Sequence, residues 1–288
     1  MKQQFNYEQA FSRNIGWLTA QEQQKLRRSR VAIAGCGGVG GAHALTLARL
    51  GIGNFSLADF DSFGIENFNR QVGANMHTLD QPKLNVMLDQ LAAINPEADL
   101  RAFETGIDDD NLADFMRDVD LYVDSLDFFA IDIRRKVFAY CAKHSIPAVT
   151  AAPLGMGTAF LCFMPDHMSF EQYFGMEDAV SVEEQYLRFY LGLAPAGLQR
   201  SYLVDPTTLN LAEKRGPSTI VGCTMGVGLA AAYAVKILLN RGPLVIAPQG
   251  LHWDPYLNTA IQTDTPDGHL NADFQLRLQQ AKQMFGIA

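Results

Sequence analysis

The chain has 288 residues, of which 48% are hydrophobic and 19% charged, and its formal net charge is −8. This composition is ordinary for a globular protein, and it excludes disordered and collagen-like classes. The acidic balance argues against a protein that binds nucleic acid or an anionic membrane over much of its surface, because such proteins are usually basic.

The first 150 residues alternate between helical and strand-like patterns. Residues 1–30 are polar and predict a helical arm, with Thr19 and Glu22 spaced as a capping box. Beyond the arm, helices are expected to end near residues 50, 94 and 144, and strands are expected at 31–34, 55–59, 100–104, 120–124 and 146–150. The alternation predicts a parallel α/β sheet with right-handed crossovers.

The alternation stops after residue 150. A strand is predicted at 157–164, helices at 169–174, 182–193, 220–239 and 271–284, a loop at 195–217, and short strands near Val245 and His252. The predicted fold is α/β, a Rossmann-like mainly parallel sheet with helices on both faces, plus a C-terminal half that adds antiparallel strands and helices. We expect three parts: an N-terminal helical arm (1–30), a nucleotide-binding part (31–155), and a substrate and dimerisation part (156–288) packed on the same sheet.

Cysteine usage and apolar segments bear on where the protein works. None of the four cysteines forms a CxxC pair, which removes zinc ribbons and thioredoxin-like motifs. The N-terminal residues lack the apolar core of a signal peptide. The apolar stretch from Ile220 to Val235 is shorter than the roughly 20 residues that span a bilayer, so we expect a buried helix there. These features predict a cytoplasmic protein with reduced thiols.

A glycine-rich turn follows the first predicted strand. Gly35, Gly37 and Gly40 form a GxGxxG motif, and Gly38 lies inside it. Glycines let the backbone approach a phosphate or ribose, and the following helix N-terminus attracts negative charge. Asp59 ends the second strand, where a carboxylate can accept hydrogen bonds from ribose hydroxyls. The motif alone fits a nucleotide site, a dehydrogenase, or a tight turn without a ligand.

A series of polar residues distinguishes between these alternatives. In chain order they are Asp59, Asp61, Asn67, Arg70, Gln71, Lys83 and Asp127. The ordered series resembles the ThiF/MoeB/HesA family, the adenylating enzymes akin to ubiquitin-activating enzyme, over roughly residues 10–160 and 216–240. The resemblance implies use of ATP and Mg²⁺ and, as is common in the family, a homodimer.

The resemblance also implies roles for individual residues. Asp59 would hold the ATP ribose, and the glycine loop, Asp61, Asn67 and Gln71 would complete the nucleotide site. Arg70 and Lys83 would lie nearest the phosphates, and Asp127 would hold Mg²⁺. Arg13 would reach into the site of the partner protomer.

The residue types suit this chemistry. Adenylation builds negative charge on a phosphate, so cations and Mg²⁺ are needed where that charge accumulates. A carboxylate such as Asp127 is a hard oxygen ligand of the kind Mg²⁺ prefers. Taken singly, Arg70 and Lys83 could be solvated surface charges, Asp127 a helix N-cap and Asn67 a turn residue. Their joint order favours the functional interpretation.

The chain departs from the family pattern in three places. Phe128 follows Asp127 where the family usually has asparagine, and Asp132 stands where an arginine is expected. Arg134 and Arg135 lie just beyond and could substitute for that arginine. The paired CxxC zinc site of many members is missing. The loop at 210–217, where some members carry a catalytic cysteine, contains none.

We therefore expect an adenylyltransferase that activates a carboxylate, the C-terminus of a small protein or peptide, without an obvious catalytic cysteine. A small-molecule carboxylate or a tRNA base is another possible acceptor, and the acidic balance disfavours nucleic acid. Two alternatives stay open at this point: an NAD(P)- or FAD-binding oxidoreductase, and a non-catalytic ThiF-like scaffold subunit.

Overall fold

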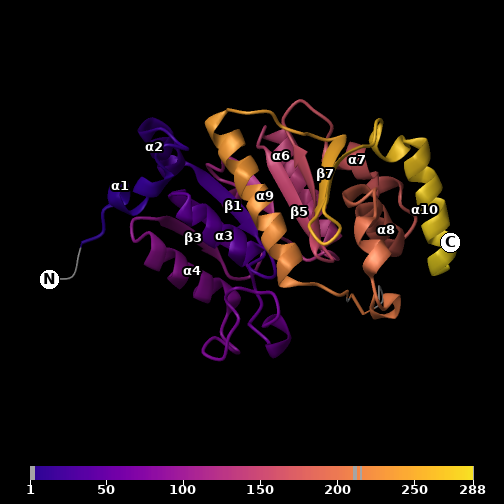
Figure 1. The fold of residues 1–288 in the computed structure, drawn as a ribbon, viewed down its shortest axis with the longest axis horizontal. Coiled ribbons are helices and arrows are strands. Elements are labelled where there is room, and N and C mark those ends of the chain that lie inside the picture. The colour runs from indigo at the N-terminus through magenta and orange to yellow at the C-terminus, as the bar shows by residue number, and fades with distance from the viewer. Residues whose placement is uncertain (1–3, 210–212, 215, 288) are drawn as a thin grey trace. The chain divides into compact units, whose positions relative to one another are not determined.

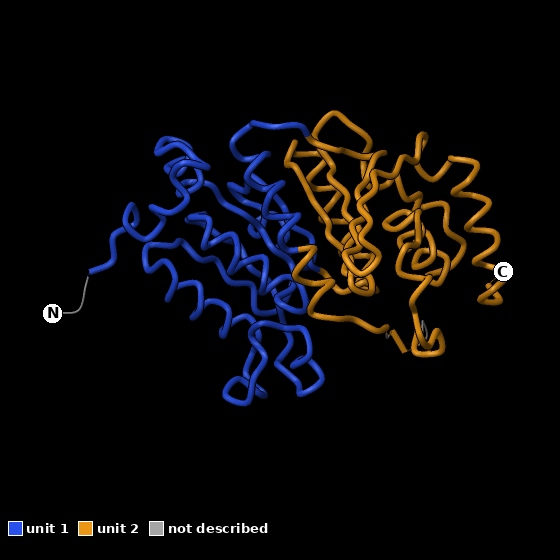
Figure 2. The backbone as a smooth tube through the Cα atoms, in the orientation of Figure 1, with its two compact units in different colours: residues 1–125, 227–243 blue, residues 126–226, 244–288 orange. Residues whose placement is uncertain are grey.

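The computed structural model describes residues 4–209, 213–214 and 216–287 (Figure 1). The chain divides into two compact units (Figure 2). Unit 1 contains residues 1–125 and 227–243, and unit 2 contains residues 126–226 and 244–288.

Unit 1 is built on a parallel sheet. Its strands are β1 (Arg30–Ala34), β2 (Asn54–Ala58), β3 (Asp99–Phe103) and β4 (Leu121–Asp124), in the spatial order β3-β2-β1-β4. The strands pair in parallel throughout, and Ala34 at the end of β1 lies opposite Ala58 of β2 and Asp124 of β4. The carboxyl ends of these three strands therefore meet at one edge of the sheet. The predicted α/β alternation is confirmed here.

The helices of unit 1 include the predicted arm. They are α1 (Tyr7–Ala10), α2 (Ala20–Arg28), α3 (Gly40–Arg49), α4 (Lys83–Ile94) and α5 (Leu112–Phe115), with short 3-10 turns η1 (Ser12–Asn14) and η2 (Ile65–Asn67). The predicted capping box is present: Glu22 N donates to Thr19 Oγ1 at 3.1 Å, and Thr19 N donates to Glu22 Oε2 at 2.8 Å. Helices α3 and α4 pack side by side (Figure 1).

Two glycines of the loop between β1 and α3 are required by the backbone. Gly35 has a φ of +91°, in the region that favours glycine. A Cβ atom at Gly40 would overlap the carbonyl oxygen of Gly35 and lie 3.0 Å from Cβ of Ser125. Gly37 differs from both, because a Cβ there would meet no atom closer than Gln71 Nε2 at 3.7 Å.

Unit 2 carries an antiparallel sheet with helices. Its strands β5 (Ala148–Leu154), β6 (Gly157–Phe163), β7 (Gln249–Asp254) and β8 (Thr259–Asp264) pair in that order, each antiparallel to the next. Its helices are α6 (Ile131–Lys143), α7 (Phe170–Phe174), α8 (Val182–Leu193) and α10 (Ala272–Phe285). Aromatic side chains fill much of its core, where Phe174 packs on Phe170 and Phe189 with ring centroids 4.6 and 5.2 Å apart.

Two details of the predicted C-terminal half are wrong. No strand forms near Val245: β7 begins at Gln249, and β8 was not predicted. Pro243 and Pro248 flank the apolar run 244–247, and proline cannot donate to a strand ladder. Strand β8 was missed because its side chains are half-buried or exposed along its length, so it has no apolar face to read.

Helix α9 (Ile220–Leu239) contributes residues to both units. Within the described part of the chain it is the one helix long and apolar enough to cross a membrane, and half of its apolar window is buried. Its first turns pack closely in unit 2, because a Cβ at Gly222 would lie 2.9 Å from the carbonyl oxygen of Gly155. This close packing is typical of a core helix.

The glycine loop gives a matched test of this packing. Gly40→Ala should lower the free energy of unfolding by about 2 kcal/mol or more, because the new Cβ overlaps backbone atoms. Gly37→Ala should change it by less than about 1 kcal/mol, because its Cβ has room. Urea denaturation of both variants checks this, and equal stabilities would contradict the described loop.

Candidate functional site

Three strand ends of unit 1 bring polar groups to one edge of the sheet. The glycine loop (35–40) follows β1, Asp59 follows β2, and Ser125 comes next after β4. In parallel α/β sheets, the crevice outside the carboxyl ends of the strands is where ligands bind. This edge is therefore the first candidate site in unit 1.

The carboxylate of Asp59 ties the glycine loop to the end of β2. Its Oδ2 accepts a hydrogen bond from Cys36 N at 2.6 Å, and its Oδ1 accepts one from Asp61 N at 2.8 Å. Burial raises the pKa of Asp59, while these two hydrogen bonds and the nearby Lys83 act in the opposite direction. Each carboxylate oxygen keeps acceptor capacity beyond one bond, so Asp59 can still receive ligand hydroxyls.

Lys83 joins this group from the first residue of α4. Its backbone N–H donates to the Asp61 carbonyl at 2.8 Å, and its Nζ lies 3.0 Å from Asp61 Oδ2. The side chain of Lys83 is only 9% exposed, whereas that of Asp61 is 54% exposed. Hydrogen bonds and an ion pair thus connect the glycine loop, Asp59, Asp61 and Lys83.

A turn between β2 and α4 brings Gln71 against the glycine loop. Asn67 is buried; its side chain accepts from Gly64 N at 3.0 Å, and its carbonyl accepts from Gln71 N at 2.9 Å. Gln71 is also buried, with Nε2 3.7 Å from the position that a Cβ on Gly37 would take. Its Oε1 is buried and has no hydrogen-bond partner among the described residues. A buried acceptor beside an open glycine is an arrangement that suits a hydrogen-bonding ligand.

Arg70 supplies a second cation in the same turn. Its Nη1 donates to the Glu66 carbonyl at 3.0 Å and to Asn69 Oδ1 at 2.8 Å. Within the described residues no carboxylate pairs with it, so its positive charge is not neutralised locally. The glycine loop and the buried lysine at the edge, with this guanidinium in the adjoining turn, are groups that suit a polyphosphate.

Arg13 takes no part in the contacts that connect the glycine loop, Asp59, Asp61 and Lys83. It lies in the η1 turn with an exposed side chain. It makes no hydrogen bond or ion pair with another described residue. Its role inferred from the resemblance therefore stays a prediction.

Asp127 belongs to unit 2 and is exposed. It is not the N-cap of α6, which is Ala130; instead its Oδ1 accepts from Phe129 N at 2.9 Å. Arg134 fixes the Asp127 backbone, because its Nη2 donates to the Asp127 carbonyl at 3.0 Å and to the Leu126 carbonyl at 2.7 Å. Oxygen ligands of this type fit Mg²⁺.

The family departures after Asp127 have a structural explanation in unit 2. Phe128 packs in an aromatic cluster, with its ring 5.3 Å from that of Phe189. The guanidinium of Arg134 lies 4.4 Å above the same Phe189 ring and is almost fully buried. Arg135 instead pairs with Glu171 and Glu177, both at 3.2 Å. Of the two arginines considered as substitutes, Arg134 is the one that holds this loop.

Ser125 was missed by the sequence analysis. Its Oγ is buried without a partner, and it faces the glycine loop at Gly40. The signal was its position directly after β4, because in a parallel sheet that residue lies next to the loop that follows β1. Arg134 was singled out from its position just beyond Asp132, but its backbone acceptors cannot be read from the sequence.

Cysteines and metal-binding clusters add little to the site. All four cysteines are buried. Burial raises the pKa of the Cys36 thiol and raises that of Cys162 to about 12. No group of three or more His, Cys, Asp or Glu side chains with metal-binding spacing occurs in the described ranges. Residues 210–212 and 215, within the loop expected to lack a catalytic cysteine, lie outside those ranges.

Comparison with known proteins identifies relatives of this chain. It is 34% identical over 152 residues to the tRNA threonylcarbamoyladenosine dehydratase of Haemophilus influenzae, which covers 52% of this chain and 57% of that protein. It is 34% identical over 143 residues to the sulfur carrier protein ThiS adenylyltransferase of Escherichia coli, covering 50% and 56%. The chain thus spans little more than half the length of these relatives.

The fold is also similar to that of a solved structure. Escherichia coli MccB with ATP superimposes with a TM-score of 0.63 at 20% identity, covering 87% of this chain and 68% of that one. The ThiF family matches residues 11–272, which is most of the chain. The resemblance inferred from the polar series is confirmed: this protein belongs to the ThiF family.

Proposed function

We propose that this protein is an ATP- and Mg²⁺-dependent adenylyltransferase that activates a carboxylate as an acyl-adenylate. The observation that carries the proposal is the linked group of glycine loop, Asp59, Asp61 and Lys83, with the unpaired Arg70 in the adjoining turn. Membership in a family with named adenylyltransferases supports it and removes the reason for an oxidoreductase.

Unit 1 would bind the nucleotide with groups that already hold their positions. Asp59 would accept the ribose hydroxyls, since its bonds to Cys36 N and Asp61 N fix its orientation. Gly37 would let the nucleotide approach the loop, because it carries no side chain and the nearest atom to a Cβ there would be Gln71 Nε2 at 3.7 Å. The unpaired Oε1 of Gln71 would accept a hydrogen bond from the nucleotide.

The reaction would need charge stabilisation more than proton transfer. A carboxylate oxygen forms a bond to the α-phosphorus, and the bond from that phosphorus to the bridging oxygen of pyrophosphate breaks. Arg70 and Lys83 would stabilise the charge that builds on the phosphates. The attacking carboxylate is ionised at neutral pH, so no general base is required.

Mg²⁺, when bound, would neutralise charge on the departing pyrophosphate. Asp127 would supply an oxygen ligand, since the donor set of a carboxylate fits this ion. Arg134 would act as a positioning residue, because it holds the carbonyls of the loop that carries Asp127. Phe128 would anchor the same loop through its aromatic contacts.

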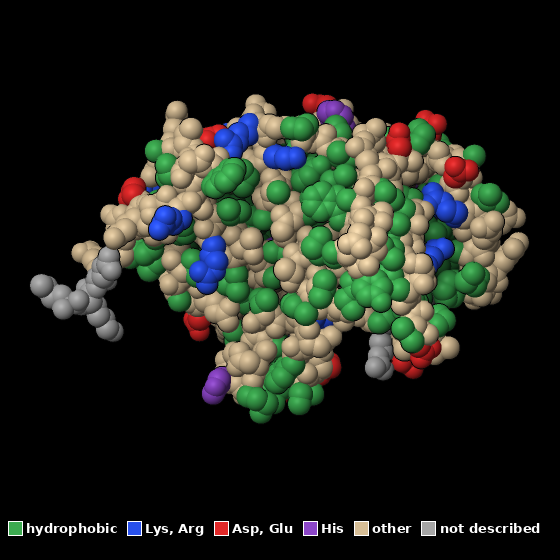
Figure 3. Space-filling model, viewed as in Figure 1, with side chains coloured by type: hydrophobic (Ala, Val, Ile, Leu, Met, Phe, Trp, Pro, Cys, Tyr) green, Lys and Arg blue, Asp and Glu red, His purple; other side chains and the backbone are tan. Residues whose placement is uncertain are grey.

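The acceptor is proposed from chemistry and from relatives. The E. coli relative is named for its action on a sulfur carrier protein, and we propose the C-terminal carboxylate of a small protein or peptide as the substrate here. The H. influenzae relative is named for a tRNA reaction, which makes tRNA a second candidate. On the face in Figure 3 the Lys and Arg side chains are scattered among hydrophobic and other groups. The formal net charge of −8 favours the protein or peptide over a polyanion such as tRNA.

The assembly and location follow the same proposal. We propose a homodimer in the cytoplasm, with Arg13 reaching the site of the partner protomer. The exposure of Arg13 and its lack of a described partner are consistent with that role. Because all four thiols are buried, we also propose that the acyl-adenylate is passed on without a thioester on this chain.

Removing either cation should abolish the first half-reaction. Lys83→Ala and Arg70→Ala should each lower the rate of ATP–pyrophosphate exchange by about 100-fold or more, because each removes charge stabilisation from the phosphates. Exchange is measured with candidate C-terminal peptides and, separately, with tRNA.

Arg49→Ala is the matched control, because Arg49 is an exposed arginine at the far end of α3 from the glycine loop. It should leave exchange unchanged. Full activity of both Lys83→Ala and Arg70→Ala would refute the assignment, and inability of the wild type to bind ATP would favour the scaffold alternative.

The metal role of Asp127 can be tested by titration. Asp127→Ala should raise the Mg²⁺ concentration needed for half-maximal exchange by about tenfold or more, because the substitution removes an oxygen ligand of the ion. Asp132→Ala, which removes an exposed carboxylate five residues on, should leave the Mg²⁺ dependence unchanged. Identical dependences in the two variants would contradict the proposal.

The four thiols should be slow to react in the folded protein. A thiol needs exposure and a lowered pKa to react rapidly. All four thiols are buried, and burial raises the pKa of Cys36 and Cys162. Reaction with Ellman's reagent should be slow in buffer and complete in guanidinium. A thiol that reacts rapidly in the native protein would instead support a thioester on this chain.

A further inference from the structure

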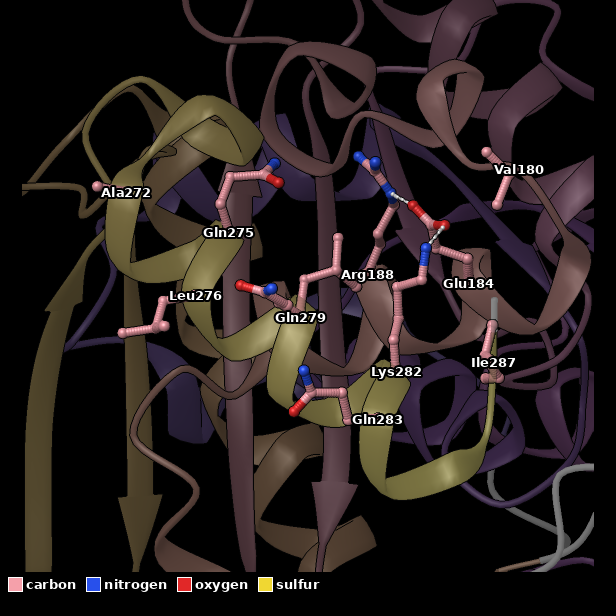
Figure 4. Close-up of a pocket in the computed structure, with 11 residues that line it drawn as sticks. Val180, Glu184, Arg188, Ala272, Gln275, Leu276, Gln279, Lys282, Gln283 and Ile287 are labelled. Carbon is pink, nitrogen blue, oxygen red and sulfur yellow. Dashed lines mark hydrogen bonds and ion pairs between the residues drawn. The ribbon is translucent and has the colours of Figure 1, made fainter.

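Unit 2 contains a pocket of about 830 Å³ between α8 and α10 (Figure 4). It lies in the part of the chain for which the sequence offered no motif. The ThiF family match ends at residue 272, where α10 begins, so this wall of the pocket lies beyond the family match. No role proposed above involves any of its residues.

A three-membered charge cluster forms one side of the pocket. The side chain of Glu184 is 3% exposed. Its carboxylate accepts hydrogen bonds from Nε of Arg188 at 2.8 Å and from Nζ of Lys282 at 2.9 Å. Burial alone would raise the pKa of Glu184, but the hydrogen bonds from Lys282 and Arg188 lower it below the usual value. Glu184 is therefore ionised at neutral pH. Among the described residues that line the pocket, two cations face one carboxylate, so these side chains carry an excess positive charge.

Lys282 has donors to spare. Its ammonium group has three N–H donors, and within the described residues it contacts only Glu184. Its side chain is 24% exposed, so these donors are accessible from the pocket. A ligand carboxylate would compensate the excess charge and satisfy the remaining donors.

Glutamine side chains continue the pocket along α10. Gln275, Gln279 and Gln283 all line it and stand in a row along the helix (Figure 4). Residues four apart on a helix are separated by about 6 Å along its axis, and equivalent backbone groups of an extended peptide repeat about every 6.6 Å. Gln275 Nε2 already donates to the His269 carbonyl at 2.6 Å. The amides of Gln279 and Gln283 each offer both a donor and an acceptor, as a peptide bond requires.

Apolar side chains border the same pocket. Val180 is 74% exposed and Leu276 is 53% exposed, and both line it together with Ile287. An extended segment presents successive side chains to opposite faces. Such a segment can therefore place apolar side chains on the exposed apolar residues of the pocket and polar side chains on the charged cluster.

We propose that the α8–α10 pocket binds an extended peptide segment that carries a carboxylate. The carboxylate contacts Lys282, the peptide backbone follows the amides of Gln279 and Gln283, and apolar side chains rest on Val180 and Leu276. The pocket shares no residue with the proposed adenylation site, and its occupancy does not require ATP.

The test is a binding measurement without nucleotide. Fluorescence anisotropy is recorded with a fluorescein-labelled octapeptide that alternates leucine and glutamate, added to the full-length protein. Saturable binding is expected, and a matching leucine–lysine octapeptide should not bind. Because ATP is absent, failure here would not bear on the exchange assays, and their failure would not bear on this site.

Two variants of equal charge and chemistry provide the comparison. Gln279→Glu places a carboxylate in the pocket and should weaken peptide binding by about tenfold or more, through repulsion and competition for Lys282. Gln280→Glu changes the neighbouring exposed residue, which does not line the pocket, and should bind like the wild type. Thermal unfolding of both variants should match, since both positions are exposed.

Three results would overturn the proposal. The first is no saturable binding of the acidic octapeptide up to about 1 mM, since a dissociation constant of that size corresponds to a binding free energy of only about −4 kcal/mol. The second is equal binding of the octapeptide by the two variants. The third is displacement of the labelled peptide by inorganic phosphate as effectively as by unlabelled peptide. The last result would identify a simple anion pocket. Loss of binding in Lys282→Met, with the fold retained, would support the proposed carboxylate contact.

Discussion

The candidate site depends on the hydrogen bond from the backbone N–H of Cys36 to the carboxylate of Asp59. This bond joins the loop after β1 to the end of β2, and the second oxygen of Asp59 orients Asp61. Asp61 in turn holds Lys83 at the start of α4. A single carboxylate therefore sets the relative positions of a glycine loop, a second acid and a buried lysine. Parallel strand pairing makes this possible, because it brings the strand ends to one edge.

Much of unit 1 could be predicted because its signals are local. The apolar runs of β1, β2 and β4, the glycine loop and the Thr19–Glu22 capping box are all readable within a few residues. The polar series after Asp59 was also recognisable, and the structure connects most of it in one unit. The roles of Arg13 and Asp127 rest on resemblance alone, since the described contacts of these residues do not extend to that group.

Two kinds of feature could not be predicted: side chains held by contacts outside a short sequence window, and segments whose apolar pattern is absent or misleading. Arg134 is buried by contact with backbone carbonyls six to eight residues away and with the Phe189 ring. The replacement at Phe128 became interpretable only when its aromatic neighbours were known. Strand β8 lacks an apolar face, and the apolar run around Val245 lies between prolines. For Arg134 and Phe128 the deciding contacts lie outside a short sequence window, whereas β8 offers no apolar face to read and the run 244–247 is limited by its own flanking prolines.

The ion pair between Lys83 and Asp61 has a consequence for how tightly resting ATP would be held. If Lys83 contacts the phosphates as proposed, Asp61 already satisfies part of its charge before any nucleotide arrives. The ion pair would then weaken the binding of Lys83 to the triphosphate of the ground state. Lys83 would still stabilise the additional negative charge that develops while the phosphorus–oxygen bond breaks. Interactions weighted in this way favour turnover over affinity. By competing with ATP for Lys83, Asp61 would thus prevent the ground-state complex with ATP from becoming too stable to react.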